Sequence, residues 1–220
     1  MTIRLEKVWY RYPGSRNWVL RNINIVFNEH KTYAIVGPNA SGKTTLLKIT
    51  ALLYKPTRGN VRAWGIDYWS LPSSEAIQLR RNIVYVHEKP ILLRGTVAYN
   101  IAYGLTLRGY TQTEAEEKAR KLLSKLELAY LADKKTKQLS AGEAQLTAIL
   151  RAVILEPKIL VLDEPLAHLD TSKREKILKL LAELRETGIG IIIATHDQYI
   201  ARILAEKTIQ IENGEIIQVN

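Results

Sequence analysis

A glycine-rich loop between two hydrophobic segments constrains the fold of this chain more than any other feature of its sequence. The loop, Gly37-Pro-Asn-Ala-Ser-Gly-Lys-Thr44, fits the pattern G-x-x-x-x-G-K-[ST] at every position. It follows an apolar run at residues 33–36 and precedes a stretch with helical spacing at residues 43–53. Backbone N–H groups of such a loop converge on phosphate groups, so the sequence predicts a nucleotide-binding α/β fold.

The residue types of the loop predict how a nucleoside triphosphate is bound. Lys43 would supply a cation to the β- and γ-phosphates, and Thr44 a hydroxyl to Mg²⁺. The alternative, an accidental match in a glycine-rich turn, does not account for the flanking strand and helix. The loop alone does not identify the reaction, because kinases, GTPases, motors and transporters share it. The residues expected around the nucleotide are Gly37, Pro38, Asn39, Ala40, Ser41, Gly42, Lys43, Thr44 and Thr45.

Composition excludes several other classes of site. The 220 residues include no cysteine, which excludes disulfides, thiolate zinc sites and thiol nucleophiles. Four histidines remain for metal or base chemistry. A formal charge of +10 is compatible with nucleic acid, an anionic membrane surface or a phosphate-bearing ligand. No apolar run approaches the roughly 20 residues of a membrane-spanning helix. We therefore expect a soluble cytoplasmic protein that reaches a membrane only through a partner.

The hydrophobic pattern predicts one α/β domain over residues 1–220. Residues 2–27 alternate like an antiparallel strand pair with a turn at Pro13-Gly14, and a further strand pair is expected at residues 60–64 and 83–86. Residues 96–155 have helical periodicity, with a capping box expected at Thr113 and Glu116. Strands then alternate with helices, and a final hairpin turns at Asn213-Gly214. The prediction is a P-loop NTPase core with a mostly parallel sheet and an N-terminal antiparallel β subdomain (1–86 and 156–220), plus an inserted α-helical subdomain (87–155).

Two carboxylates follow one of the later predicted strands. Ile159-Leu-Val-Leu162 precedes Asp163 and Glu164. A buried strand that ends in a carboxylate is the usual place for the magnesium partner of a phosphate loop, so Asp163 is the candidate metal ligand. Glu164 lies one residue further, where it could accept a proton from an attacking water. The alternative for Glu164 is a solvated loop carboxylate.

The segment Leu139-Ser-Ala-Gly-Glu143 makes the interpretation more specific. It precedes a predicted helix and resembles the signature Leu-Ser-Gly-Gly-Gln of the ATP-binding cassette (ABC) family. The resemblance covers essentially the whole chain. It keeps the family's order of phosphate loop, Gln-loop segment, signature, Asp-Glu strand end, Leu-Asp and late histidine. A phosphoryl-transferring kinase, which shares the phosphate loop, is not expected to carry this signature.

The resemblance implies a head-to-tail homodimer, or a pseudo-dimer with a related subunit, that encloses two ATP. Ser140 and the Gly142 amide would contact the γ-phosphate of ATP held by the second copy, and a helix N-terminus suits such an anion. Tyr12 would stack on adenine, although Tyr12, like Tyr10, also fits an exposed strand aromatic. The resemblance gives catalytic roles to Glu164, His196, Lys43 and Asp170, with His196 orienting the attacking water and Asp170 in the loop that crosses the dimer seam. His30, His87 and His168 have no metal-ligand spacing and are expected to be surface or capping histidines.

Three residues depart from the family pattern. Glu88 stands where the family usually has glutamine; it can still offer an oxygen to Mg²⁺, beside Thr44 and Asp163, but it lacks the amide donor. The metal contact is expected to survive, whereas the timing of hydrolysis is in question. Ala141 replaces glycine, a costly change only where a positive φ is needed, and Glu143 replaces glutamine.

The expected function is that of the ATP-hydrolysing subunit of an ABC transporter of the prokaryotic importer type. Its partners would be a membrane permease subunit, which places it at the inner face of the cell membrane, and an extracytoplasmic solute-binding protein. Residues 90–108 are equally compatible with a permease-docking surface and with core. The sequence of residues 88–109 most resembles the corresponding segment of oxyanion importers. The alternatives are an exporter subunit and a soluble ABC-type ATPase that acts on nucleic acid or the ribosome; no nucleic acid partner is expected, because the charge is its only direct support.

Overall fold

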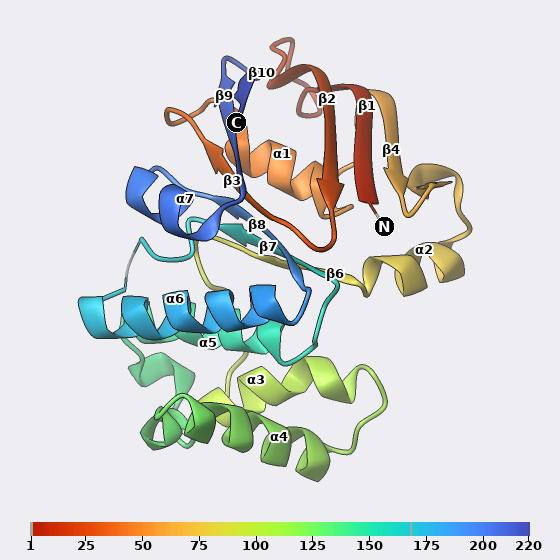
Figure 1. Ribbon diagram of the computed structural model, residues 1–220. Coiled ribbons are helices and arrows are strands. Elements are labelled where there is room, and N and C mark those ends of the chain that lie inside the picture. The colour runs from red at the N-terminus through yellow and green to blue at the C-terminus, as the bar shows by residue number, and fades with distance from the viewer. Residues whose placement is uncertain (1, 168) are drawn as a thin grey trace. The chain divides into compact units, whose positions relative to one another are not determined.

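The N-terminal strands form a small antiparallel sheet. The structure is a computed structural model and describes residues 2–167 and 169–220. The sheet contains β1 (Thr2–Tyr10), β2 (Leu20–Asn28), β4 (Arg58–Ala63) and β5 (Ile66–Asp67), in the order β2-β1-β4-β5. Figure 1 shows β2, β1 and β4 side by side. The antiparallel pairing of β1 with β2 confirms the predicted start of the fold.

A second, six-stranded sheet contains the strand that leads into the glycine loop. It consists of β3 (Thr32–Val36), β6 (Ile83–Val86), β7 (Ile159–Asp163), β8 (Gly190–Ala194), β9 (Lys207–Glu212) and β10 (Glu215–Val219), in the order β10-β9-β3-β8-β7-β6. Strand β3 pairs in parallel with β8 and β9, and β7 pairs in parallel with β8. β9 and β10 form the predicted hairpin, with positive φ at both Asn213 and Gly214. The mostly parallel core is thus confirmed.

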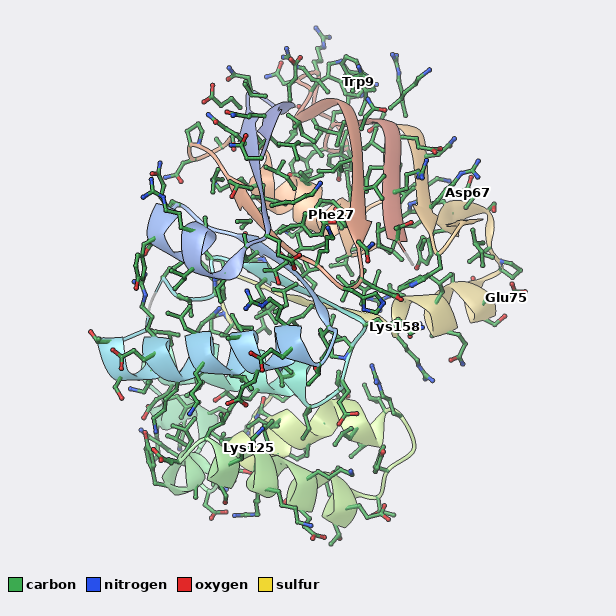
Figure 2. All side chains as sticks on the ribbon, viewed as in Figure 1. Trp9, Phe27, Asp67, Glu75, Lys125 and Lys158 are labelled. Atoms are coloured by element: carbon green, nitrogen blue, oxygen red, sulfur yellow. The ribbon has the colours of Figure 1, made fainter. Side chains whose placement is uncertain are left out.

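Helix α1 (Lys43–Thr50) packs against this sheet and completes the hydrophobic core. It lies close to β7 and β8, and its buried apolar side chains belong to the same core cluster as those of the two strands, as expected for a helix that covers a parallel sheet. The core also takes in the buried faces of the antiparallel strands, including the fully buried Phe27 (Figure 2). The helix ends three residues before the predicted position, because the chain turns away at Leu52, where φ is +59°.

The predicted helical region does form helices, but one helix starts at a different residue from the predicted one. It contains α3 (Val97–Thr106), α4 (Gln112–Lys125) and α5 (Ala141–Val153). The capping box of α4 is formed by Thr111 and Glu114, so the prediction of Thr113 and Glu116 was wrong. Both pairs have the same spacing, but starting at the first pair adds two residues to the helix and lets Gln112 donate a hydrogen bond to Glu116.

The predicted pairing of residues 60–64 with 83–86 was also wrong. Strand β4 pairs with β1, in the register Leu5 opposite Val61, whereas β6 lies at the edge of the other sheet, beside β7. The hydrogen bonds of β4 are therefore already taken within the antiparallel sheet. In the sequence, α2 (Ser73–Arg80) lies between β4 and β6. The hydrophobic pattern did not predict this helix, because none of its residues is buried.

The chain divides into two compact units. The first contains residues 1–85, 158–164 and 182–220, and the second contains residues 86–157 and 165–181. Helix α6 (Thr171–Glu186) contributes residues to both units, and α7 (Gln198–Leu204) belongs to the first. No helix of the described residues is both long enough and apolar enough to cross a membrane.

Candidate functional site

Three predicted motifs meet at one edge of the six-stranded sheet. Strands β3, β8 and β7 are neighbours and run parallel, so their carboxyl ends lie at the same edge. The glycine loop follows β3, Asp163 is the last residue of β7 and Glu164 comes directly after it, and His196 follows β8. Backbone hydrogen bonds tie these ends together: Thr195 N donates to Ile35 O (3.1 Å) and Glu164 N donates to Ala194 O (3.0 Å). All of these residues belong to the first unit.

The glycine loop is shaped by close backbone contacts that only glycine permits. A Cβ atom at Gly37 would lie 2.1 Å from the carbonyl oxygen of Ile211 in β9. Gly42, the residue before α1, has φ +104°, and a Cβ atom there would lie 2.8 Å from a methyl group of Leu20. The β9–β10 hairpin also holds the loop, because Gly214 N donates to Ser41 O (3.1 Å). The two sheets of the unit therefore fix the loop conformation.

The side chains of the loop leave donors for an anion. Lys43 Nζ donates to the carbonyl oxygens of Gly37 (2.8 Å) and Pro38 (2.9 Å), which holds the ammonium group against the loop. Ser41 Oγ is buried and has no hydrogen-bond partner among the described residues, which marks a donor that phosphate could satisfy. Thr44 is half-buried at the first turn of α1, and Pro38, Asn39 and Ala40 are exposed.

Glu164 and His196 form a side-chain pair at the sheet edge. His196 Nδ1 lies 2.9 Å from Glu164 Oε2, and the imidazole is 67% exposed whereas the carboxylate is 14% exposed. Glu164 adopts a left-handed backbone conformation, with φ +44°, which is uncommon for a residue with a side chain. Such strain is often found at functional sites, where surrounding structure enforces it. The solvated-loop interpretation of Glu164 does not explain this pairing.

Asp163 is a buried carboxylate with one neutral donor. The residue is 1% exposed, and Tyr85 Oη donates to its Oδ2 at 2.9 Å. No lysine or arginine of the described chain lies within ion-pair distance of it. A buried carboxylate without a cationic partner is costly, so this position suits a bound cation. Together with the Thr44 hydroxyl, a hard oxygen donor, it fits Mg²⁺. Tyr85 is not among the site residues predicted from the sequence, where its only signal is a tyrosine in an otherwise aliphatic strand.

Tyr12 lies in a cluster of aromatic rings beside the loop helix. Its hydroxyl is 3.1 Å from Thr45 Oγ1, and its ring meets those of Tyr10 and Tyr54 edge-on. The side chain is 40% exposed and borders a pocket of about 500 Å³. Burial, with the neighbouring phenols, raises the pKa of Tyr10. Tyr12 can therefore present an accessible ring, whereas Tyr10 is 8% exposed and belongs to the core.

The signature segment in the second unit is built around a helix N-terminus. Ser140 Oγ accepts a hydrogen bond from Glu143 N (3.2 Å), and Glu143 Oε2 accepts one from Ser140 N (2.9 Å), which forms a capping box at α5. Glu143 also receives hydrogen bonds from Lys134 Nζ at 2.8 and 3.0 Å. Ala141 and Gly142 are the first two residues of α5. Ala141 is helical, so alanine there carries no positive-φ cost.

Glu88 and Asp170 also belong to the second unit. Glu88 is half-buried in a bend, and its carboxylate has no hydrogen bond or ion pair within the part of the chain that the structure describes. Asp170 accepts hydrogen bonds from the backbone N–H (3.0 Å) and the ammonium group of Lys173 at the start of α6. Hydrogen bonding from Lys173 lowers the pKa of Asp170.

The remaining histidines have structural contacts where they are described. His30 Nδ1 is 2.9 Å from Gly188 O, and His87 Nδ1 accepts a hydrogen bond from Lys89 N (3.1 Å). His168 lies outside the described residues. Across residues 2–167 and 169–220, no group of three or more His, Asp or Glu side chains is arranged to hold a metal ion.

The chain is similar in sequence to known proteins over most of its length. Residues 20–167 match the family model described as ABC transporter. The chain is 32% identical over 222 residues to a putative ABC transporter ATP-binding protein of Bifidobacterium longum, covering 94% of this chain and 28% of that protein. It is 32% identical to the phosphate import ATP-binding protein PstB 2 of Natronomonas pharaonis, covering 91% of this chain and 74% of that protein.

A further relative and a solved structure have similar identity. The methionine import ATP-binding protein MetN 1 of Burkholderia lata is 32% identical, covering 98% of this chain and 64% of that protein. The dimeric structure of a post-hydrolysis state of an ATP-binding cassette, bound to ADP and Pi, superposes with a TM-score of 0.89 at 32% identity. That likeness covers 99% of this chain and 97% of the solved chain.

Proposed function

The chain belongs to the ABC transporter family, and we propose that it is an ATP-hydrolysing subunit whose nucleotide is bound at the edge of the six-stranded sheet. Lys43 and the backbone N–H groups of Gly37 and residues 39–45 would hold the phosphates, and Tyr12 would stack on adenine. Thr44 and Asp163, both in the first unit, would hold Mg²⁺, which supplies positive charge to the phosphate oxygens when bound.

The contact between Glu164 and His196 carries this proposal. In hydrolysis a water oxygen bonds to the γ-phosphorus, the bond to the ADP oxygen breaks, and the water loses a proton. Glu164 is the carboxylate at the sheet edge that could accept this proton, and His196, 2.9 Å away, could hold the carboxylate and orient the water. The Glu164 side chain is 14% exposed, so only a small part of it is open to bulk solvent.

A second copy of the chain would complete each site. Ser140 and Gly142 stand at the N-terminus of α5, whose free N–H groups and dipole favour an anion. The proposal assigns them, with Asp170, to the ATP of the partner copy. The dimeric state of the solved cassette that this chain resembles supports the assignment.

The Glu164→Gln variant tests the function directly. It should bind Mg-ATP with wild-type affinity, hydrolyse it at least about 100-fold more slowly, and accumulate as a dimer, because the nucleotide that bridges two copies is no longer cleaved. Turnover is measured by phosphate release and the dimer by sedimentation. Lys43→Ala is the control, which should bind little nucleotide and accumulate no nucleotide-bound dimer. Unchanged turnover in Glu164→Gln would remove Glu164 from its role.

The role in transport is proposed at the cytoplasmic face of the membrane, with a permease subunit and a solute-binding protein as partners. The segment before α3 supports a docking role: Ile91 is 76% exposed and Leu93 36%, whereas Val97 and Ile101 are core. Asn100, fully buried, holds this segment through hydrogen bonds with Leu93 N (2.8 Å) and Leu93 O (3.0 Å).

We propose import of a small oxyanion, which the phosphate importer among the relatives supports. The methionine importer has the same identity, so cargo must be measured. Vesicles containing the subunit with its permease should take up labelled phosphate, sulfate or tungstate in an ATP-dependent manner. Uptake of methionine alone would replace the oxyanion assignment.

A further inference from the structure

Strand β6 places a tyrosine hydroxyl against the carboxylate at the end of β7. Tyr85 Oη donates to Asp163 Oδ2 at 2.9 Å, and both residues belong to the first unit. β6 is the edge strand beside β7, so the phenol reaches the carboxylate from the neighbouring strand. The other residues of β6 are Ile83, Val84 and Val86, none of which could donate such a bond.

The hydrogen bond from Tyr85 holds the side chain of Asp163, for which no other side-chain partner is found among the described residues. Asp163 is 1% exposed, and no cationic side chain of the described residues pairs with it. A carboxylate has two oxygens that accept hydrogen bonds or bind a metal. With Oδ2 bonded to Tyr85, rotation about the Cβ–Cγ bond is restricted and Oδ1 remains for a cation. Carboxylate ligands that are held by an outer hydrogen bond bind metal more tightly than free ones, typically by 10- to 100-fold.

We propose that Tyr85 is a positioning residue for the metal ligand Asp163, so that its hydroxyl sets the Mg²⁺ affinity of the nucleotide site without touching the metal or the nucleotide. The inference rests on the proposed function, because it requires Asp163 to bind Mg²⁺. Tyr85 is not among the site residues predicted from the sequence. An aliphatic residue in its place would keep the strand but raise the Mg²⁺ concentration that the site requires.

Tyr85→Phe is the test, because it removes the hydroxyl and keeps the ring. Mn²⁺ binding in the presence of a non-hydrolysable ATP analogue, followed by electron paramagnetic resonance, should weaken about tenfold. The Mg²⁺ concentration for half-maximal ATPase activity should rise by a similar factor, whereas nucleotide affinity in the presence of a chelator should not change. Most of the maximal rate should return at saturating Mg²⁺. Unchanged or tighter Mn²⁺ binding would overturn the proposal.

Tyr33→Phe is the matched control. Tyr33 is 4% exposed in β3 of the same unit, and its hydroxyl accepts a hydrogen bond from Asn28 N (3.0 Å) at the opposite end of the sheet from the site. Both variants lose one phenolic hydrogen bond, so a purely structural role predicts similar effects on metal binding. If Tyr85→Phe does not fold, Tyr85→Met carries the same test.

Asp163→Asn separates this inference from the proposed function. It should abolish Mn²⁺ binding at the nucleotide site, and adding Tyr85→Phe to it should cause no further loss, since Tyr85 acts through the carboxylate. If Asp163→Asn keeps wild-type metal binding, the proposed metal site and the inference both fail. If it loses binding while Tyr85→Phe does not, only the inference fails.

Discussion

Two residues near the predicted γ-phosphate position have backbone conformations that disfavour a side chain. Ala40 in the glycine loop has φ +62°, and Glu164 has φ +44°. A left-handed conformation costs a residue with a Cβ atom roughly 1–2 kcal/mol. At Glu164 the side chain is needed for the contact with His196, so the cost accompanies a function. At Ala40 the exposed methyl group makes no such contribution.

Ala40→Gly should therefore stabilise the protein. Removing the strained methyl group should outweigh the greater flexibility of glycine in the unfolded chain, and we expect the free energy of unfolding to rise by about 0.5–1 kcal/mol. Urea denaturation measures the change. Gly42→Ala is the opposite case, since its Cβ atom would lie 2.8 Å from Leu20, and it should destabilise. A loss of stability in Ala40→Gly would show that the methyl group makes a contact of its own.

Residues at the start of helix α5 supply the hydrogen-bond partners of the helix N-terminus. The capping box of Ser140 and Glu143 satisfies N–H groups at the helix start. Burial alone would raise the pKa of Glu143, but hydrogen bonds from Lys134 and from Ser140 lower it overall. The departure from glutamine at this position is thus matched by a lysine nine residues earlier in the chain.

The charge of Glu143 should contribute stability that depends on pH. Because its pKa is lower in the folded protein, this stability is present above the ordinary value of 4.5 and is lost as the pH falls through the folded pKa. Glu143→Gln should cost about 1 kcal/mol at neutral pH, since Lys134 is 34% exposed, and the difference from wild type should shrink below pH 4.5.

Urea denaturation at several pH values, followed by far-ultraviolet circular dichroism, measures this difference. Glu117→Gln is the control: it breaks the solvent-exposed ion pair with Lys121 on α4 and should change stability little at any pH. A gap between wild type and Glu143→Gln that stays constant down to the acid limit would show that the charge of Glu143 contributes nothing.

At the scale of the whole molecule, the candidate site residues divide between two compact units. Lys43, Asp163, Glu164 and His196 belong to the first, and the signature segment belongs to the second. A head-to-tail dimer would join the first unit of one copy to the second unit of the other. Such symmetry makes each copy contribute one half of each of two sites.

Mixing two inactive variants tests this division. Lys43→Ala should inactivate the phosphate loop and Ser140→Ala should weaken the signature, so each homodimer is impaired. A mixed dimer has one site with both lesions and one with neither, and an equal mixture should recover about a quarter of the wild-type ATPase rate for random pairing of the copies. Phosphate release measures it against each variant alone. A mixture no more active than its components would mean that each copy uses its own signature.

Much of the fold could be predicted because its signals are local. The alternation of residues 2–27, the Asn213-Gly214 turn and the glycine loop each require a particular backbone over a few residues, and the structure confirms them. The order of the motifs likewise indicated the family. The partner of β4 and the start of α4 were predicted wrongly. More than one strand could have paired with β4, and two Thr-x-x-Glu pairs with the same spacing stand at the start of α4.

The sequence by itself determined the chemistry that is available: a phosphate loop, two carboxylates after a buried strand, a late histidine and a signature segment. Only the tertiary structure decided that Glu164 meets His196, that Tyr85 bonds Asp163, and that Lys134 pairs with Glu143. The physical reason is that each of these contacts joins side chains brought together by strand order or helix packing. No local pattern in the chain encodes those distances.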